Sequence, residues 1–165
     1  MDEPAERPRV EEDLSATPIE RPVLKRLAVI DHGANRVLTV GLRLSAQGQT
    51  HARVDPDRAT QVLGNLVSNA LRYGSPGTPV EIALRKLDGE LEMSVHNQGP
   101  RIPSQVLPRL FDAFQRGVPD GSRHGDGLGL GLYIVQQIVE AHDGGVSVRS
   151  EEGSGTTFAV RWPKK

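Results

Sequence analysis

The sequence predicts an α+β protein, a two-layer sandwich in which helices cover one face of a mixed, mostly antiparallel sheet. Two long segments carry apolar residues at helical spacing, and several short segments alternate apolar with polar residues. The two kinds of segment follow each other irregularly, whereas a parallel stack alternates strand and helix regularly. The length of 165 residues suits one domain.

Composition and charge exclude several classes of protein. The chain has no cysteine, which excludes a disulfide scaffold, a thiolate metal site and a cysteine nucleophile. A net charge of −1 and an aromatic content of 4% argue against nucleic-acid binding. No apolar run is long enough to span a membrane and no signal peptide is recognisable, so we expect a soluble, cytoplasmic domain without membrane contact.

The first third of the chain is the least strongly patterned. Residues 1–22 combine four prolines with many charges and are predicted to form a flexible leader, which leaves 23–165 as the folded domain. Residues 23–31 are compatible with a short helix ended by Gly33. Residues 36–45 alternate and predict a strand, with 51–54 as a short partner strand after a turn.

The helix at 57–73 has clear signals at both ends. Asp55 can cap its N-terminus, Pro56 suits the first helical position, and Gly74 ends it. Asn65, Asn69, Arg72 and Tyr73 form a polar stripe beside the apolar face of this helix. Amide oxygens suit Mg²⁺ and a guanidinium suits phosphate, although a solvated helix edge would carry similar residues.

A hairpin and a polar turn follow. Residues 79–86 and 90–96 alternate around an Asp88–Gly89 turn. The turn 97–103 comes directly after the second strand, a common place for binding groups. Asn97 offers both a donor and an acceptor, which could match an adenine edge; a plain turn is the alternative.

A glycine-rich segment precedes the second long helix. Residues 115–131 form a loop that runs into an apolar stripe over 130–139, and a closing hairpin is predicted over 146–162. Glycines let a backbone approach a ligand, and a helix N-terminus favours an anion. A dinucleotide-binding fingerprint is disfavoured because it needs a strand directly before the loop, and a Walker-type phosphate loop is excluded because it needs a Gly-Lys-Ser/Thr ending. A simple linker is disfavoured because a linker would not lead directly into an amphipathic helix.

Taken in order, these segments resemble the catalytic ATP-binding domain of bacterial sensor histidine kinases. This family belongs to the Bergerat-fold GHKL group, together with gyrase, heat-shock chaperone and mismatch-repair ATPases. The resemblance covers roughly residues 20–163. Its four boxes are QVLGNLVSNALRYG (61–74), VHNQGPRIP (95–103), LFDAFQRG (110–117) and GDGLGLGLYIVQQIVEAHDGG (125–145).

The resemblance implies ATP or ADP and Mg²⁺ as ligands, held partly under a flexible ATP lid. It implies Asn69 as the metal ligand, with Asn65 and Arg72 at the phosphates and Tyr73 lining the pocket. Phe111 and Phe114 would anchor the lid. The remaining implied nucleotide contacts are Asn97, Gly99, Ile102, Gly125, Gly127, Leu128, Gly129, Leu130, Gly131 and Thr157, with Thr156 also near the base.

Two positions depart from the family pattern. Asn97 stands where the family usually has an aspartate that accepts from the adenine amino group, and Arg101 stands where a glycine is usual. A neutral acceptor makes a weaker bond than a charged one, so we expect weakened or altered nucleotide affinity. These departures keep open a degenerate nucleotide-binding scaffold.

The implied reaction is phosphoryl transfer. ATP-hydrolysing relatives tend to place a glutamate at Asn65, and an amide cannot act as a general base for water. The family acceptor is a histidine on a separate dimerisation domain, which in turn serves a response regulator. None of the five histidines of this chain matches that acceptor, so we expect a monomer that depends on a partner domain. A stand-alone serine kinase of the anti-sigma type, acting as a binding switch, is the alternative.

Overall fold

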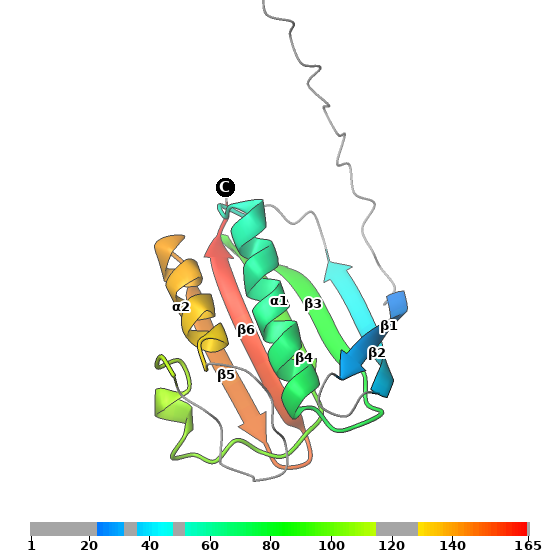
Figure 1. Ribbon diagram of the computed structural model, residues 1–165. Coiled ribbons are helices and arrows are strands. Elements are labelled where there is room, and N and C mark those ends of the chain that lie inside the picture. Colours follow the sequence, from blue (N-terminus) through cyan, green and yellow to red (C-terminus); the bar gives the residue numbers. More distant parts are fainter. Residues whose placement is uncertain (1–22, 32–35, 48–51, 115–128, 165) are drawn as a thin grey trace, which may run out of the picture.

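A computed structural model describes residues 23–31, 36–47, 52–114 and 129–164 (Figure 1). A six-stranded sheet in the order β1-β2-β3-β4-β6-β5 carries the two helices α1 and α2 on one face. Only β2 and β3 pair in parallel; the other neighbours are antiparallel. This arrangement confirms the predicted two-layer α+β sandwich. The predicted leader, residues 1–22, lies outside the described residues.

The helix predicted for 23–31 is wrong, because these residues form strand β1 (Val23–Asp31). β1 pairs along its whole length with β2 (Arg36–Gln47), from Val23 opposite Leu44 to Asp31 opposite Arg36. A nine-residue helix is marginal by itself, whereas pairing with β2 satisfies the backbone of the segment. The apolar residues of this segment fit the period of a helix as well as that of a strand. Pairing with β2 therefore decides that the segment forms a strand.

The predicted partner strand at 51–54 is also wrong. The neighbours of β2 are β1 and β3 (Val80–Leu87), so β2 has no open edge for a further strand. Ala52 instead forms an isolated bridge with Lys164, and the backbone N–H of Arg53 donates to the carbonyl of Pro163 at 3.0 Å. This segment therefore ties the start of α1 to the end of the chain.

Helix α1 (Pro56–Tyr73) begins and ends where the sequence predicts. The Asp55 carboxylate accepts from the backbone N–H groups of Asp57 and Arg58 at 2.9 and 3.0 Å. At the other end, the N–H of Gly74 donates to the carbonyl of Ala70. These bonds satisfy groups that a helix end leaves free, which fixes the ends of α1.

The remaining elements follow the sequence prediction closely. β3 and β4 (Glu90–Asn97) form the predicted hairpin, and β5 (Gly145–Glu151) and β6 (Gly155–Pro163) form the closing one. The 3₁₀ turn η1 (Leu107–Arg109) follows the turn after β4, and α2 spans Gly131–Ala141. Within the described residues, no helix is both long enough and apolar enough to cross a bilayer.

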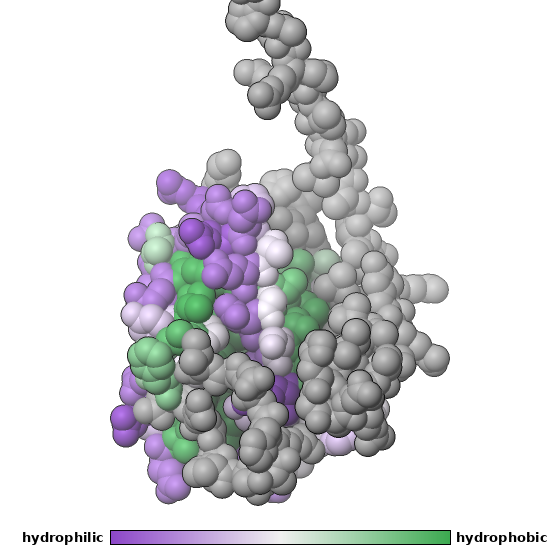
Figure 2. Space-filling view, in the orientation of Figure 1, coloured by the Kyte–Doolittle hydropathy of each residue, from purple (hydrophilic) through white to green (hydrophobic). Residues whose placement is uncertain are grey.

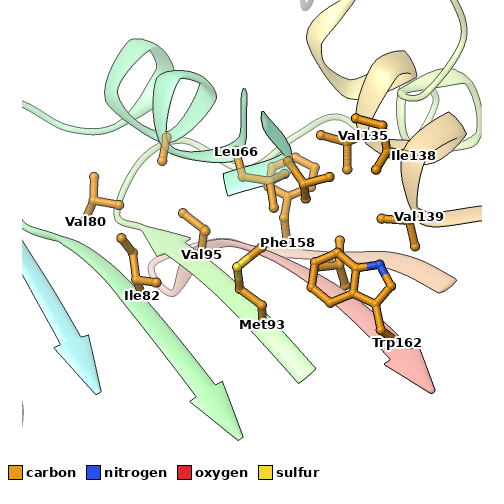
Figure 3. Packing of buried hydrophobic residues seen from close by; sticks show 13 residues of the cluster. Leu66, Val80, Ile82, Met93, Val95, Val135, Ile138, Val139, Phe158 and Trp162 are labelled. Carbon is orange, nitrogen blue, oxygen red and sulfur yellow. The ribbon is translucent and has the colours of Figure 1, made fainter. Parts of the chain in front are cut away.

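The core lies between the two helices and strands β3, β4 and β6 (Figure 3). Leu66 from α1 and Val135 from α2 meet Phe158 from β6, and all three are nearly inaccessible to solvent. Each such side chain contributes about 1.5–3 kcal/mol through burial. On the surface, a hydrophilic band follows the outer side of α1, as expected for an amphipathic helix (Figure 2). The core thus fixes α1 and α2 relative to the sheet.

Candidate functional site

The two asparagines of α1 lie on its partly buried flank, one helical turn apart. Asn65 and Asn69 are both half-buried, between the core face and the solvent face of the helix. A Cβ placed on Gly131 would lie 3.6 Å from Asn65 Oδ1, so the Asn65 amide faces the first residue of α2. α1 therefore brings the Asn65 amide to the point where α2 begins, and Asn69 follows one turn further along α1.

The first turn of α2 has no capping side chain at its N-cap position. Leu130 occupies the N-cap position in a helical conformation, and its apolar side chain makes no capping bond to the first turn. Gly129, Leu130 and Gly131 are half-buried there, and Gly131 lies beside Asn65. Free N–H groups and the positive end of the helix dipole favour an anion at such a place. The predicted contacts Gly125, Gly127 and Leu128 lie outside the described residues.

Arg72 and Tyr73 occupy the C-terminal turn of α1. The Arg72 guanidinium carbon lies 5.6 Å from the centre of the Tyr73 ring, a cation–π contact, and Tyr73 is 45% exposed. The Tyr73 carbonyl lies against Gly99, where an added Cβ would come within 2.7 Å of it. Gly99 thus lets the turn after β4 pack directly onto the end of α1.

Asn97 is the last residue of β4 and one of few buried polar side chains among the described residues, with 4% of its surface exposed. Its Nδ2 donates to the Gln98 carbonyl at 3.2 Å. The amino group of the Asn97 amide is therefore bonded within the protein, and this bond orients Oδ1 as an acceptor. The backbone N–H of Ser75 donates to the same Gln98 carbonyl at 2.7 Å, which links the turn to the residues after α1.

The two threonines of β6 lie on opposite faces of the sheet. Thr156 pairs with Asn97 across the β4–β6 ladder, is buried, and shares the helix-covered face with Phe158 and Val160. The Thr157 hydroxyl instead lies 2.9 Å from His96 Nδ1, on the uncovered face. The structure therefore brings Thr156, and not the predicted contact Thr157, beside Asn97. Strand alternation outward from Phe158 puts the two threonines on opposite faces of the sheet, and the pairing of β6 with β4 puts Thr156 on the face of Asn97.

Thr157 borders a separate open hollow on the uncovered face. This hollow measures about 270 Å³ and is also lined by Arg149, Glu151, Ser154 and Gly155. The Arg149 guanidinium donates to the Glu151 carboxylate at 3.0 Å, and this hydrogen bond and the charge of Glu151 raise the pKa of Arg149. Both charges of the hollow are thus paired with each other, and they lie on the opposite face of the sheet from Thr156 and Asn97.

The loop between β4 and η1 is held by a buried hydroxyl that the sequence reasoning missed. The backbone N–H of Ile102 donates to Ser150 Oγ at 2.9 Å, and Ser150 Oγ lies 2.8 Å from Thr156 Oγ1. Ile102 itself is half-buried against the core, and Arg101 is exposed. In the sequence, Ser150 continues the alternation of the apolar residues Val146 and Val148, and this position is the feature that indicates a buried hydroxyl.

The two predicted lid anchors differ in their surroundings. The Phe111 ring packs edge-on to Phe158, with the centroids 6.3 Å apart, so it belongs to the core. Phe114 is 70% exposed and has a positive φ of 63°, a conformation that non-glycine residues seldom adopt. The structure therefore supports a packing role for Phe111 and leaves Phe114 at the surface.

The donors collected here fit a nucleotide with one hard cation. Within the described part of the chain, no group of three or more histidine, cysteine, aspartate or glutamate side chains could hold a metal ion. Asn69 offers a neutral oxygen, and Mg²⁺ is commonly held by few protein ligands together with substrate phosphates and water. The start of α2 supplies donors for phosphate, and Asn97, at the end of β4 on the helix-covered face, supplies an acceptor.

Comparison with known proteins matches the chain to an ATPase family model and to sensor histidine kinases. A family model described as "Histidine kinase-, DNA gyrase B-, and HSP90-like ATPase" matches residues 54–165. Signal transduction histidine-protein kinase AfsQ2 of Streptomyces coelicolor is 36% identical over 121 residues, 73% of this chain and 22% of that protein. Sensor histidine kinase CusS of Escherichia coli O157:H7 is 42% identical over 111 residues, 67% of this chain and 23% of that protein.

A solved structure agrees in fold. Full-length ShkA in complex with AMPPNP superposes with a TM-score of 0.63 and 29% sequence identity, covering 74% of this chain and 25% of that chain. The chain spans about a fifth of the length of the curated relatives it matches (17% to 23%).

Proposed function

The chain belongs to the histidine kinase-, DNA gyrase B- and HSP90-like ATPase family, and from this premise we propose that it binds ATP with Mg²⁺ and transfers the γ-phosphate to a histidine on a separate phosphoacceptor domain. The sensor histidine kinases among its relatives support this reaction, and the AMPPNP complex of ShkA supports an adenine nucleotide as the ligand.

The base is recognised at the end of β4. Asn97 Oδ1 accepts from the adenine amino group, and the buried Thr156 hydroxyl opposite it on β6 donates to the neighbouring ring nitrogen N1. An acceptor beside a donor matches the amino and N1 groups of the adenine edge. The bond from Asn97 Nδ2 to the Gln98 carbonyl supports this assignment, because it presents the acceptor half of the amide.

The phosphates are bound between α1 and α2. Asn69 is the proposed Mg²⁺ ligand, and Asn65 faces the first turn of α2, whose N–H groups bind phosphate oxygens together with Gly125, Gly127, Leu128, Gly129, Leu130 and Gly131. Arg72 adds a positive charge at the phosphates, and Tyr73 and Ile102 border the nucleotide. The bound Mg²⁺ neutralises phosphate charge.

The residue at position 65 favours transfer over hydrolysis. The Asn65 amide orients phosphate but cannot take a proton from water, so the chain lacks a general base at this place. In transfer, a bond forms between the imidazole nitrogen of the acceptor and the γ-phosphorus as the bond to the β-phosphate oxygen breaks, and ADP leaves. This reaction needs positioning and charge stabilisation rather than a protein base.

The two described histidines support an acceptor outside this chain. His96 Nδ1 is engaged with the Thr157 hydroxyl, and His142 Nδ1 lies 2.8 Å from the Ile138 carbonyl at the end of α2. Both rings are therefore held locally through Nδ1. A response regulator as the later partner is part of the same proposal.

The observation that carries the proposal is the position of the Asn65 amide at the start of α2, with Asn69 one turn further along α1 and Asn97 on the same helix-covered face of the sheet. Calorimetric titration with ADP, in the presence of Mg²⁺ and again with excess EDTA, tests it. We expect saturable binding that weakens at least tenfold without the metal. No heat at millimolar ADP would favour the alternative of a nucleotide-free scaffold, which the neutral Asn97 motivates.

A further inference from the structure

We propose that Ser150 is a positioning residue for recognition of the base, a role that rests on the function proposed above. Ser150 lies on the edge strand β5 with 8% of its surface exposed. It alternates with Val146 and Val148, which pack against the core, so it belongs to the helix-covered face. A buried hydroxyl at an otherwise apolar position must have hydrogen-bond partners.

Ser150 has two partners, and their chemistry sets the direction of the bonds. The Ile102 N–H can only donate, so Ser150 Oγ is the acceptor at 2.9 Å. Among the described residues, the acceptor within reach of the Ser150 proton is Thr156 Oγ1, at 2.8 Å. If Thr156 donated instead, the Ser150 proton would be buried without an acceptor, which is costly. The bonds therefore run from Ile102 to Ser150 to Thr156.

The direction of this relay determines what Thr156 presents. Because Thr156 Oγ1 accepts from Ser150, its own proton is available for a further bond. Thr156 stands opposite Asn97 in the β4–β6 ladder, so its proton and Asn97 Oδ1 form a donor–acceptor pair on one face. Ser150 thus sets the polarity of the Thr156 hydroxyl and also anchors the loop at Ile102.

Removal of the Ser150 hydroxyl should affect one atom of the ligand more than the others. Without Ser150 Oγ, the Thr156 hydroxyl is no longer held as a donor toward the base, and the Ile102 N–H loses its acceptor. The contribution of ring N1 to binding should then shrink, whereas the contribution of the phosphates should stay. A merely structural role of Ser150 would weaken binding of all nucleotides alike.

The test is a cycle that combines protein variants with two ligands. Calorimetry measures the affinity of the full chain for Mg²⁺·ADP and for the 1-deaza analogue of ADP, in which a C–H replaces ring N1. We expect the unaltered chain to prefer ADP by about tenfold, the value of one good hydrogen bond. Ser150→Ala and Ser150→Cys should reduce this preference to about twofold, since alanine removes the hydroxyl and a thiol is a weak donor and acceptor. Ser147→Ala, on the same strand but exposed, should keep the full preference.

The outcomes separate this role from the proposed function. An unchanged preference for ADP over the analogue in both Ser150 variants, even with weaker binding overall, would overturn the positioning role alone. Failure of both variants to fold, detected through fluorescence of the buried Trp162, would assign Ser150 to stability and also overturn it. Absence of ADP binding by the unaltered chain would overturn the proposed function together with this role.

Discussion

The carbonyl oxygen of Asn97 and the α-carbon of Gly155 approach so closely that no Cβ fits between them. Gly155 also has a positive φ of 78° and is buried at the start of β6. The same Cβ would come within 2.9 Å of the Gln98 α-carbon. The start of β6, which carries Thr156, therefore packs directly against the end of β4, which carries Asn97. This contact fixes the positions of Asn97 and Thr156, the two residues that we propose to bind the adenine base.

Gly155→Ala tests this contact. We expect a loss of about 3 kcal/mol or more in the free energy of unfolding, because the left-handed conformation and the backbone clash both oppose a side chain. Gly153→Ala is the matched control, since Gly153 has a similar φ of 72° but open space around it, and it should lose only about 1 kcal/mol. Urea denaturation followed by fluorescence of the single tryptophan, Trp162, measures both. Equal losses in the two variants would show that the close approach contributes nothing.

Asn97→Asp should change affinity and stability in opposite directions. A charged acceptor makes a stronger bond to the adenine amino group, so ADP affinity should rise about fivefold, or ~1 kcal/mol. The same change removes the donor to the Gln98 carbonyl and buries a charge, so the protein without nucleotide should become less stable. Calorimetry and urea denaturation give the two values. Weaker ADP binding by this variant would mean that the pocket is adapted to the amide.

Asn69→Ala should remove the metal-dependent part of binding. If Asn69 holds Mg²⁺, ADP affinity in the presence of the metal should fall to the value that the unaltered chain shows in EDTA. Ser68→Ala, the exposed neighbour on the same helix, is the control and should leave the affinity unchanged. A full response to Mg²⁺ in the Asn69 variant would remove our assignment of the metal ligand.

Asp55→Ala should destabilise the fold without affecting the nucleotide site. The Asp55 carboxylate satisfies two backbone N–H groups at the start of α1, and loss of such a cap costs about 1 kcal/mol. Asn65 and Asn69 lie two or more turns further along α1, so ADP affinity at a temperature where the variant is folded should stay within a factor of two. A large loss of affinity would show that the start of α1 is coupled to the site.

The parts of the fold that were predictable are those with strong local signals. Asp55, Pro56 and Gly74 fix the ends of α1, and Asp88–Gly89 fixes the β3–β4 turn, so tertiary structure had little left to decide there. β1 was not predictable in this way, because its apolar residues fit a helix as well as a strand and the choice depends on pairing with β2.

The site shows the same division. Asn65 and Asn69 could be placed together from helical periodicity alone. The choice between Thr156 and Thr157 needed the register of β6 against β4, and Ser150 needed the pairing of β5 with β6. Strand alternation names the two candidate faces, but only the packed helices show which face is covered.

The most direct test of the account is a crystal structure of this chain with AMPPNP and Mg²⁺. We expect the adenine amino group within hydrogen-bond distance of Asn97 Oδ1, the metal on the Asn69 amide oxygen, and the phosphates at the first turn of α2. Adenine bound away from Asn97, or a metal held without Asn69, would contradict the central claim that these residues form one nucleotide site.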